Sequence, residues 1–262
     1  MSSLTLHPVD WSIVGPALIA GLLVLATHVP LGLQVLRKGI VFIDLAIAQI
    51  AGLGVIAADN LGWEPQGWGV QGAAVAAALL GAALLTWTER RWPDIQEALI
   101  GTLFVLASCG GILLLAGNPH GGEHLKDLLV GQILWVTPSQ LGAMAGLSAL
   151  VLALWFGLGA GRLGRAGFYV LFALAVTASV QLVGVYLVFS SLIMPALAVR
   201  RASPRWQLPL AWGLGAIAYA LGLALSAMLD WPSGAVVVLT MAVVACVVAA
   251  LIGRSEHPTA VR

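Results

Sequence analysis

The feature that most constrains this chain is the near absence of charge from its long apolar runs. These runs cover about 12–36, 39–58, 70–88, 98–116, 128–157, 167–199, 207–228 and 232–252, and Asp44 is the only charged side chain inside one. A helix of roughly 20 apolar residues crosses a bilayer core of about 30 Å. Only 9% of all residues are charged, against roughly 25% in a soluble domain. The sequence therefore predicts an all-α, polytopic transmembrane helical bundle, with residues 1–262 forming one transmembrane domain in a lipid bilayer.

The basic residues predict which connectors face the cytoplasm. Lys and Arg occur in short connectors and tails, whereas the 59–69 connector contains acidic residues only. Because cytoplasmic loops are enriched in Lys and Arg, we expect an external N-terminus and a cytoplasmic C-terminus. No basic residue precedes the first run, so we expect that run to be a permanent span rather than a cleaved signal peptide.

The run 167–199 does not fit one simple crossing. Basic connectors flank it on both sides, and 33 residues of helix would measure about 50 Å. Non-helical backbone at membrane depth requires surrounding protein or a water-filled cavity. We therefore predict a broken or re-entrant pair, with the break between Gly184 and Pro195, where Gly, paired serines and Pro occur together.

Asp44 is the strongest candidate for a functional residue. An ionisable side chain inside a span costs about 2.5–3.5 kcal/mol on insertion scales, so it is a functional hypothesis by default. The alternative is that Asp44 reaches the interface or pairs close to it, since Lys38 is only six residues away. Gln49 and His28 are further polar candidates for a metal pathway, although an intramembrane His is also commonly a hydrogen-bonded packing residue.

The connector 117–127 carries a second group of metal-ligand residue types. His120 and His124 lie there with Glu123 and Asp127, and imidazole nitrogens and carboxylate oxygens bind divalent ions. A Gly-rich loop of this kind also fits an ordinary solvated surface. Cys109 and Cys246 lie inside apolar runs and are interpreted as buried small hydrophobes rather than as a disulfide or metal site.

Several chemistries lack their motifs. The sequence contains no GxxxxGK[ST] loop for nucleotide phosphates. It also contains no GxSxG elbow and no HExxH. We therefore expect a chain that is not an enzyme and has no cofactor of its own. Its net charge of +1 gives no reason to expect a nucleic-acid partner.

Three blocks resemble the permease subunits of metal-type ABC transporters, which import zinc, manganese or iron(II). The first is 36–39 with 42–49, which is similar to an Arg-containing turn and a Phe-x-Gly-Asp-Ala-x-Ser-His helix. The second is 97–101 with 128–137, similar to Glu-Ala-x-x-Gly and Leu-x-Gly-x-Leu-x-Val-Ser/Thr segments. The third is 183–196, similar to Val-Gly-x-x-Leu-Val-x-x-Leu-Leu-x-Pro-Ala. Their order and spacing agree over roughly residues 15–250.

The resemblance implies a homodimeric, multi-pass permease of a bacterial inner membrane. Its partners would be a separate cytoplasmic ATP-binding subunit and an external metal-binding protein. It places Asp44 near the ion path, but puts Gln49 where the family usually has His, and an amide is the poorer ligand for transition metals. The 157–167 connector is also shorter than the family's ATPase-docking segment. Candidate ATPase contacts are the exposed-loop arginines Arg90, Arg91, Arg162, Arg165, Arg200 and Arg201.

Two other functions remain open on the residues alone. An ion-coupled secondary transporter also combines an intramembrane acid with a broken helix, although no inverted repeat is visible. A non-transporting membrane scaffold would use Asp44 as a pairing residue at an interface with another membrane chain.

Overall fold

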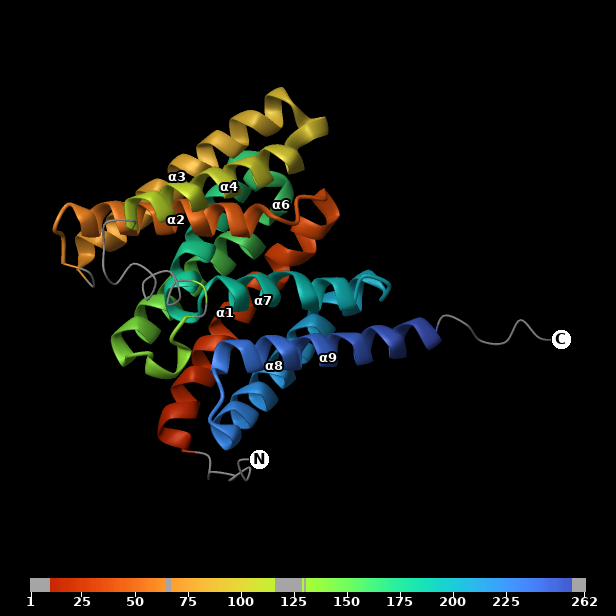
Figure 1. Cartoon of the computed structure of the whole chain (residues 1–262). Coiled ribbons are helices and arrows are strands. Elements are labelled where there is room, and N and C mark those ends of the chain that lie inside the picture. Colours follow the sequence, from red (N-terminus) through yellow and green to blue (C-terminus); the bar gives the residue numbers. More distant parts are fainter. Residues whose placement is uncertain (1–9, 65–66, 116–128, 130, 256–262) are drawn as a thin grey trace.

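The computed structural model describes residues 10–64, 67–115, 129 and 131–255. This part of the chain is helical and contains no strand (Figure 1). Its helices are α1 (Trp11–Lys38), α2 (Ile43–Asn60), α3 (Trp68–Arg91), α4 (Gln96–Leu115), α6 (Pro138–Val183), α7 (Val185–Ala198), α8 (Pro204–Leu229) and α9 (Ser233–Ser255). Two 3₁₀ turns, η1 (Pro93–Ile95) and η2 (Ile133–Trp135), lie between them. Among the described residues, 8 stretches are long and apolar enough to cross a membrane, which confirms the predicted polytopic helical bundle.

Local capping explains where several helices begin and end. The Asp10 carboxylate accepts a hydrogen bond from the Ser12 N–H at 2.9 Å and caps the start of α1. Gly39 ends α1 in the left-handed conformation, at φ 71°, which is cheap only for glycine. Thr137 and Gln140 form a capping box at the start of α6. The span predicted at 128–157 therefore begins only at Pro138.

The long element α6 consists of two membrane-crossing segments. Gly159 and Gly164 have φ values of 72° and 62°, which interrupt the helix between them. The resulting spans are Pro138–Gly159 and Arg162–Val183. The 157–167 connector is therefore a short glycine-bounded turn rather than a separate domain.

The predicted break in the 167–199 run is confirmed at its first position. Gly184 has φ 80° and ψ 162° and separates α6 from α7. The two arms are unequal, because α7 has only 14 residues, about 21 Å of helix, and is shorter than the hydrocarbon core. Gly131 lies directly against the backbone of Val183 and Gly184, so the segment before α6 covers the break.

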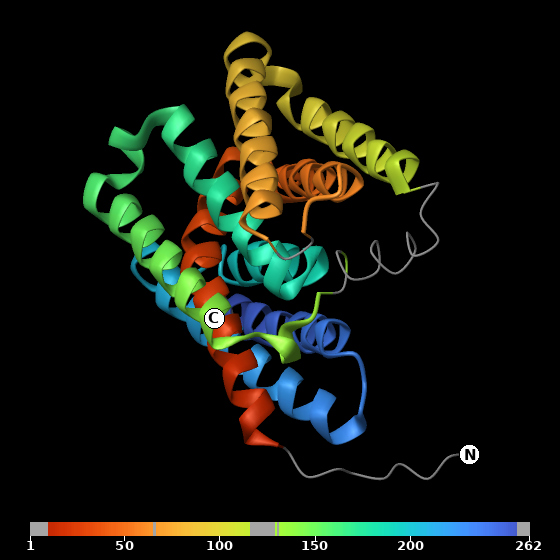
Figure 2. The same cartoon turned by 90° about the vertical axis from the view of Figure 1, so that its left-hand side faces the viewer.

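Helix α1 crosses the centre of the bundle and packs against α6, α7 and α8. Figure 2 shows α3 and α4 beside α2; both pack chiefly on α2, and α3 also packs on α6. Close packing relies on small residues. At Gly32 a Cβ atom would overlap the backbone carbonyl of Leu192 in α7, and Gly21 lies against the ring of Tyr219 in α8.

The basic connectors meet at one end of the bundle, which we call the basic end. Lys38 and Arg165 both approach Glu89, and Arg37 donates to Gln207 at 3.0 Å. These contacts join the ends of α1 and α3, the middle of α6 and the start of α8, on the right of Figure 1. At the opposite end, the acidic end, the described charged residues are carboxylates only: Asp10, Asp59, Glu64 and Asp230.

The interpretation of the two cysteines as buried was wrong. Cys109 on α4 and Cys246 on α9 are both exposed and free. Both helices are apolar on their outer faces as well as inside, so apolar sequence alone does not indicate which face a residue occupies.

Candidate functional site

Asp44 lies in the first turn of α2, at the basic end of the bundle. The chain turns at Gly39–Phe42 before α2 begins, so the carboxyl group enters the core at the helix start rather than deep along a span. Its side chain is 1% exposed, and neither carboxylate oxygen has a hydrogen-bond partner among the described residues. The partial positive charge of a helix N-terminus favours an acid at this place. Asp44 is thus a buried carboxyl group with free ligand atoms.

Glu97 fixes the start of the helix that carries Asp44. The N–H of Phe42, the N-cap residue of α2, donates to Glu97 Oε1 at 3.2 Å. The other oxygen, Oε2, is buried without a described partner. Because this bond joins α4 to the first turn of α2, Glu97 is a positioning residue for Asp44. The sequence alone could not indicate this role, because Glu97 belongs to α4 and the N–H that it accepts from belongs to the N-cap residue of α2.

His28 lies in the middle of α1, fully buried. Its Nδ1 lies 2.9 Å from the Val24 carbonyl oxygen. A carbonyl oxygen only accepts, so this hydrogen bond requires the proton on Nδ1 and leaves the Nε2 lone pair free. Nε2 has no partner among the described atoms. The ring is therefore both a packed, hydrogen-bonded residue and a potential ligand.

The structure does not bring the sequence-predicted ligands together in one chain. Asp44 is in the first turn after the basic end, whereas His28 precedes Lys38 by ten residues, about 15 Å along α1. Gln49 is buried on α2, five residues after Asp44, which places it about 140° around the helix. No group of three or more His, Cys, Asp or Glu suited to a metal ion occurs in the described part of the chain. His120 and His124 lie outside the described residues.

A charge cluster at the basic end was not anticipated from the sequence. Lys38 Nζ donates to Glu89 Oε1 at 3.2 Å, and Arg165 Nε lies 3.8 Å from the same oxygen. Lys38 also lies 5.2 Å from the centre of the Phe168 ring. Glu89 therefore connects α1, α3 and the segment of α6 that follows the glycine-bounded turn. The signal in the sequence is a single Glu in the last turn of a span, beside basic connectors.

A polar contact beside this cluster links α3, α4 and α6. Gln96 Nε2 donates to the Leu85 carbonyl oxygen at 3.1 Å and to the Tyr169 hydroxyl at 3.2 Å. All three residues are buried. The basic end is consequently held together by polar contacts from four helices, and Arg165, one residue after the turn at 159–164, takes part in them.

The candidate ATPase-contact arginines lie at this same basic end with their side chains accessible. All six side chains are exposed: Arg90, Arg91, Arg162, Arg165, Arg200 and Arg201. The end of α9 joins them, since Gly253 lies beside the Arg201 guanidinium. Three connectors that are far apart in the sequence thus bring exposed arginines to the same end of the bundle.

The sequence of the whole helical region matches one family. The ABC 3 transport family matches residues 10–158 and 162–252, which is nearly the whole described chain. The chain belongs to the ABC 3 transport family. This ABC 3 chain is therefore a multi-pass membrane protein of a transport family. The interval 159–161 between the two matched parts lies inside its glycine-bounded turn at 159–164.

Similar proteins agree with the family and the fold. An uncharacterized membrane protein of Synechocystis sp. is 27% identical over 252 residues, covering 87% of this chain and 86% of its own. A chain of PsaBC from Streptococcus pneumoniae, solved in complex with Fab, superposes with a TM-score of 0.72 at 23% identity and covers 89% of this chain and 90% of that one. An inward-facing metal-chelate type ABC transporter gives a TM-score of 0.69 at 16% identity, with coverage of 97% and 91%. At these identities the two structures show the fold.

Proposed function

We propose that this chain is the membrane-spanning permease subunit of an ATP-binding-cassette importer for a divalent metal ion. The observation that carries the proposal is the match to the ABC 3 transport family along both parts of the chain. ATP hydrolysis would belong to a separate cytoplasmic subunit, and the whole chain would form one transmembrane domain. The membrane would be a bacterial inner membrane.

The charge distribution supports this assignment of partners. Basic surfaces face the cytoplasm in membrane proteins, so the basic end is the proposed contact for the ATP-binding subunit. The acidic end would then face an external metal-binding protein, and its Asp59, Glu64 and Asp230 attract cations by their charge. This orientation keeps the N-terminus outside and the C-terminus inside.

The metal path would form between two copies of the chain. A single chain has no preformed cluster of ligands among its described residues, and the span Pro138–Gly159 is only 17% buried. Gly142 and Gly146 on this span are exposed, with open space where a Cβ atom would stand. A small-xxx-small pair lets two helices approach closely in a membrane, so this span is the proposed homodimer contact.

Asp44 is the proposed acid on the path. A buried carboxylate with two unpartnered oxygens lowers the energy of a cation in low dielectric. His28 would offer Nε2 at a different depth, and Gln49 an amide oxygen. Zinc, manganese and iron(II) are the candidate ions.

The deciding experiment is the ATPase activity of the chain reconstituted with its candidate ATP-binding subunit, measured with zinc, manganese or iron(II). We expect one ion to stimulate hydrolysis in the wild type and not in Asp44→Asn. Asp10→Asn is the matched control, because Asp10 is an exposed acid at the opposite end from the proposed ATPase contact, and Asn caps a helix as well as Asp does. Metal uptake driven by a proton gradient without any ATPase would instead indicate a secondary transporter. Normal function of Asp44→Asn would remove Asp44 from the path and favour the scaffold function.

A further inference from the structure

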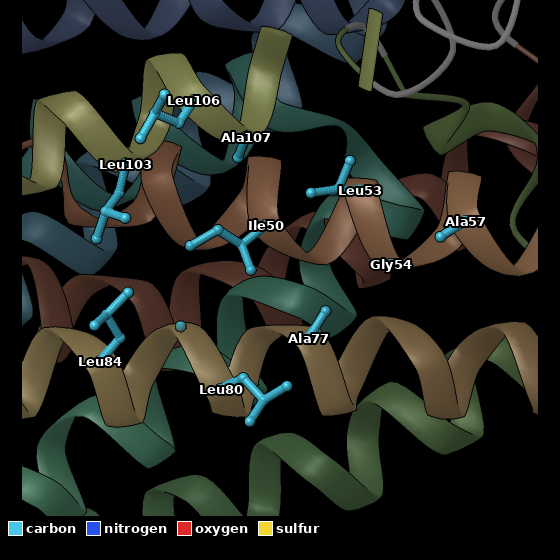
Figure 3. A pocket seen from close by; sticks show the side chains of 11 residues that line it. Ile50, Leu53, Gly54, Ala57, Ala77, Leu80, Leu84, Leu103, Leu106 and Ala107 are labelled. Carbon is cyan, nitrogen blue, oxygen red and sulfur yellow. The ribbon is translucent and has the colours of Figure 1, made fainter. Parts of the chain in front are cut away.

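An apolar groove opens between α3 and α4, with α2 as its floor (Figure 3). Both helices pack on α2 but diverge from each other beyond the η1 connection, as Figure 2 shows. The groove has a volume of about 460 Å³. Only apolar residues line it, among them Ile50, Leu53, Leu80, Leu84, Leu103 and Leu106.

The groove is open to the outside of the bundle. Leu80 on its α3 wall is 73% exposed and Leu106 on its α4 wall is 62% exposed. Its floor is fixed by close packing, since a Cβ atom at Gly54 would lie 2.7 Å from the Ala73 carbonyl oxygen. Helices α2 and α3 are therefore already in direct contact along the floor, while the α3 and α4 walls diverge above it.

The surroundings of the groove indicate lipid rather than a second copy of the chain. All three helices are membrane-crossing candidates, so the lining lies at hydrocarbon depth. The first half of α6, which carries the proposed homodimer contact, lies on the left of Figure 2, whereas α4 lies on the right. An acyl chain is the apolar group that surrounds this face.

Exposed aromatic and basic side chains lie together at the basic end of the groove. Trp87 and Trp92 are both exposed and make an edge-to-face contact with ring centres 5.2 Å apart, and Trp is enriched at the membrane interface. Arg90 and Arg91 are exposed beside them, with the Arg91 guanidinium 5.9 Å from the Trp92 ring. Arg91 follows Leu84 by seven residues, about 10 Å along α3.

The charge at this place is positive. Glu89 is engaged by Lys38 at 3.2 Å, so it does not neutralise the two arginines. Glu97 at the start of α4 is partly buried and accepts from the Phe42 N–H. Among the exposed side chains, Asp94 is the acid of the adjoining turn, so two positive charges stand against one negative charge. Lys and Arg near an anionic membrane surface are attracted to its headgroups.

We propose that this groove binds one acyl chain of an anionic phospholipid whose phosphate lies against Arg90 and Arg91. The lipid fills the space between α3 and α4 and holds the η1 connection between them at the cytoplasmic membrane interface. The site is independent of the proposed cargo, since it uses none of the residues assigned to the metal path.

Native mass spectrometry of the purified, delipidated protein with phosphatidylglycerol or phosphatidylcholine of equal chain length tests this site. We expect about tenfold tighter retention of one phosphatidylglycerol per chain, reduced to the phosphatidylcholine value in the Arg90→Gln/Arg91→Gln variant. The matched control is Arg200→Gln/Arg201→Gln, which removes two exposed arginines from another connector and should keep the preference. Equal retention of both lipids by the wild type, or equal loss in the control, would overturn the headgroup assignment.

The acyl chain is tested by filling the groove. Ala77→Phe places a ring in the lining, and Ala83→Phe places the same ring on an exposed position of the same helix. We expect Ala77→Phe to lose retention of both lipids and Ala83→Phe to keep it. Unchanged lipid retention in a folded Ala77→Phe protein would overturn the proposal, and simultaneous dissociation into monomers would identify a second copy as the occupant. If Ala77→Phe does not fold, the arginine variants still decide.

Discussion

Replacing Asp44 should make the protein more stable and less active at the same time. The carboxyl group is 1% exposed and has no partner among the described residues. This arrangement destabilises the fold, so a function is the reason we infer for keeping it. On insertion scales an Asp at the centre of a membrane helix costs about 2.5–3.5 kcal/mol, which is an upper value for Asp44 because it lies in the first turn of α2. The helix dipole at the start of α2 offsets up to about 1 kcal/mol of this cost. The Asp44→Leu variant should therefore gain up to about 2 kcal/mol in unfolding free energy.

The stability assay is reversible unfolding in mixed micelles, with wild type, Asp44→Leu and Asp44→Asn compared under one set of conditions. Asp44→Asn should gain less than Asp44→Leu, because a buried amide without a partner is also unfavourable. Both variants should lose the metal stimulation of the partner ATPase. An Asp44→Leu protein less stable than the wild type would refute the reasoning, because it would mean that the carboxyl group is held by favourable contacts.

Three further substitutions test the packing and polar contacts. Glu89→Gln should lower the unfolding free energy by about 1–2 kcal/mol in the same micelle assay. This is less than the 3–5 kcal/mol lost when one partner of a fully buried ion pair is removed, because the side chains of Lys38 and Glu89 remain 24% and 17% exposed. An unchanged unfolding free energy would mean that the charge cluster contributes nothing to stability. Gly32→Val should strongly reduce folded protein recovered after gel filtration, because its side chain meets a backbone carbonyl of α7. Gly72→Ala, at an open position of α3, should be recovered like the wild type. Tyr219→Phe should lower the unfolding free energy by about 1 kcal/mol, because it removes the 2.9 Å hydrogen bond between the tyrosine hydroxyl and a serine hydroxyl of α7. The same unfolding curve measures this. An unchanged unfolding free energy would show that water in the unfolded state satisfies the hydroxyl as well as the serine does in the folded state.

The helical class and the number of membrane spans followed from the sequence, because apolar length is a one-dimensional property. The break near Gly184 was also predictable, since basic residues on both sides of 167–199 exclude a single crossing. Residues 131–137 were predicted as part of a span but contain only the short 3₁₀ turn η2 before the capping box at Thr137. Apolar composition could not distinguish a membrane helix from an apolar non-helical segment that packs against Gly184.

The site depends more strongly on tertiary structure. Asp44 stood out in the sequence as the one charge inside an apolar run, yet its position at the start of α2 depends on the turn at Gly39 and on Glu97 from α4. Glu89 did not stand out, because its partners come from α1 and α6. A contact between residues so distant in sequence leaves no local pattern.

The sequence by itself determined that the chain spans a membrane many times, that its basic connectors gather on one side, and that one buried acid needs an explanation. Hydrophobic length and charge placement suffice for these conclusions, because insertion into a bilayer is governed by transfer free energy, segment by segment. Only the tertiary structure decided that His28 and Asp44 lie at different depths, that Glu89 joins three helices, and that α3 and α4 leave a groove open. These features depend on which helix faces meet, and in apolar helices small differences in packing decide this without a strong polar pattern in the sequence.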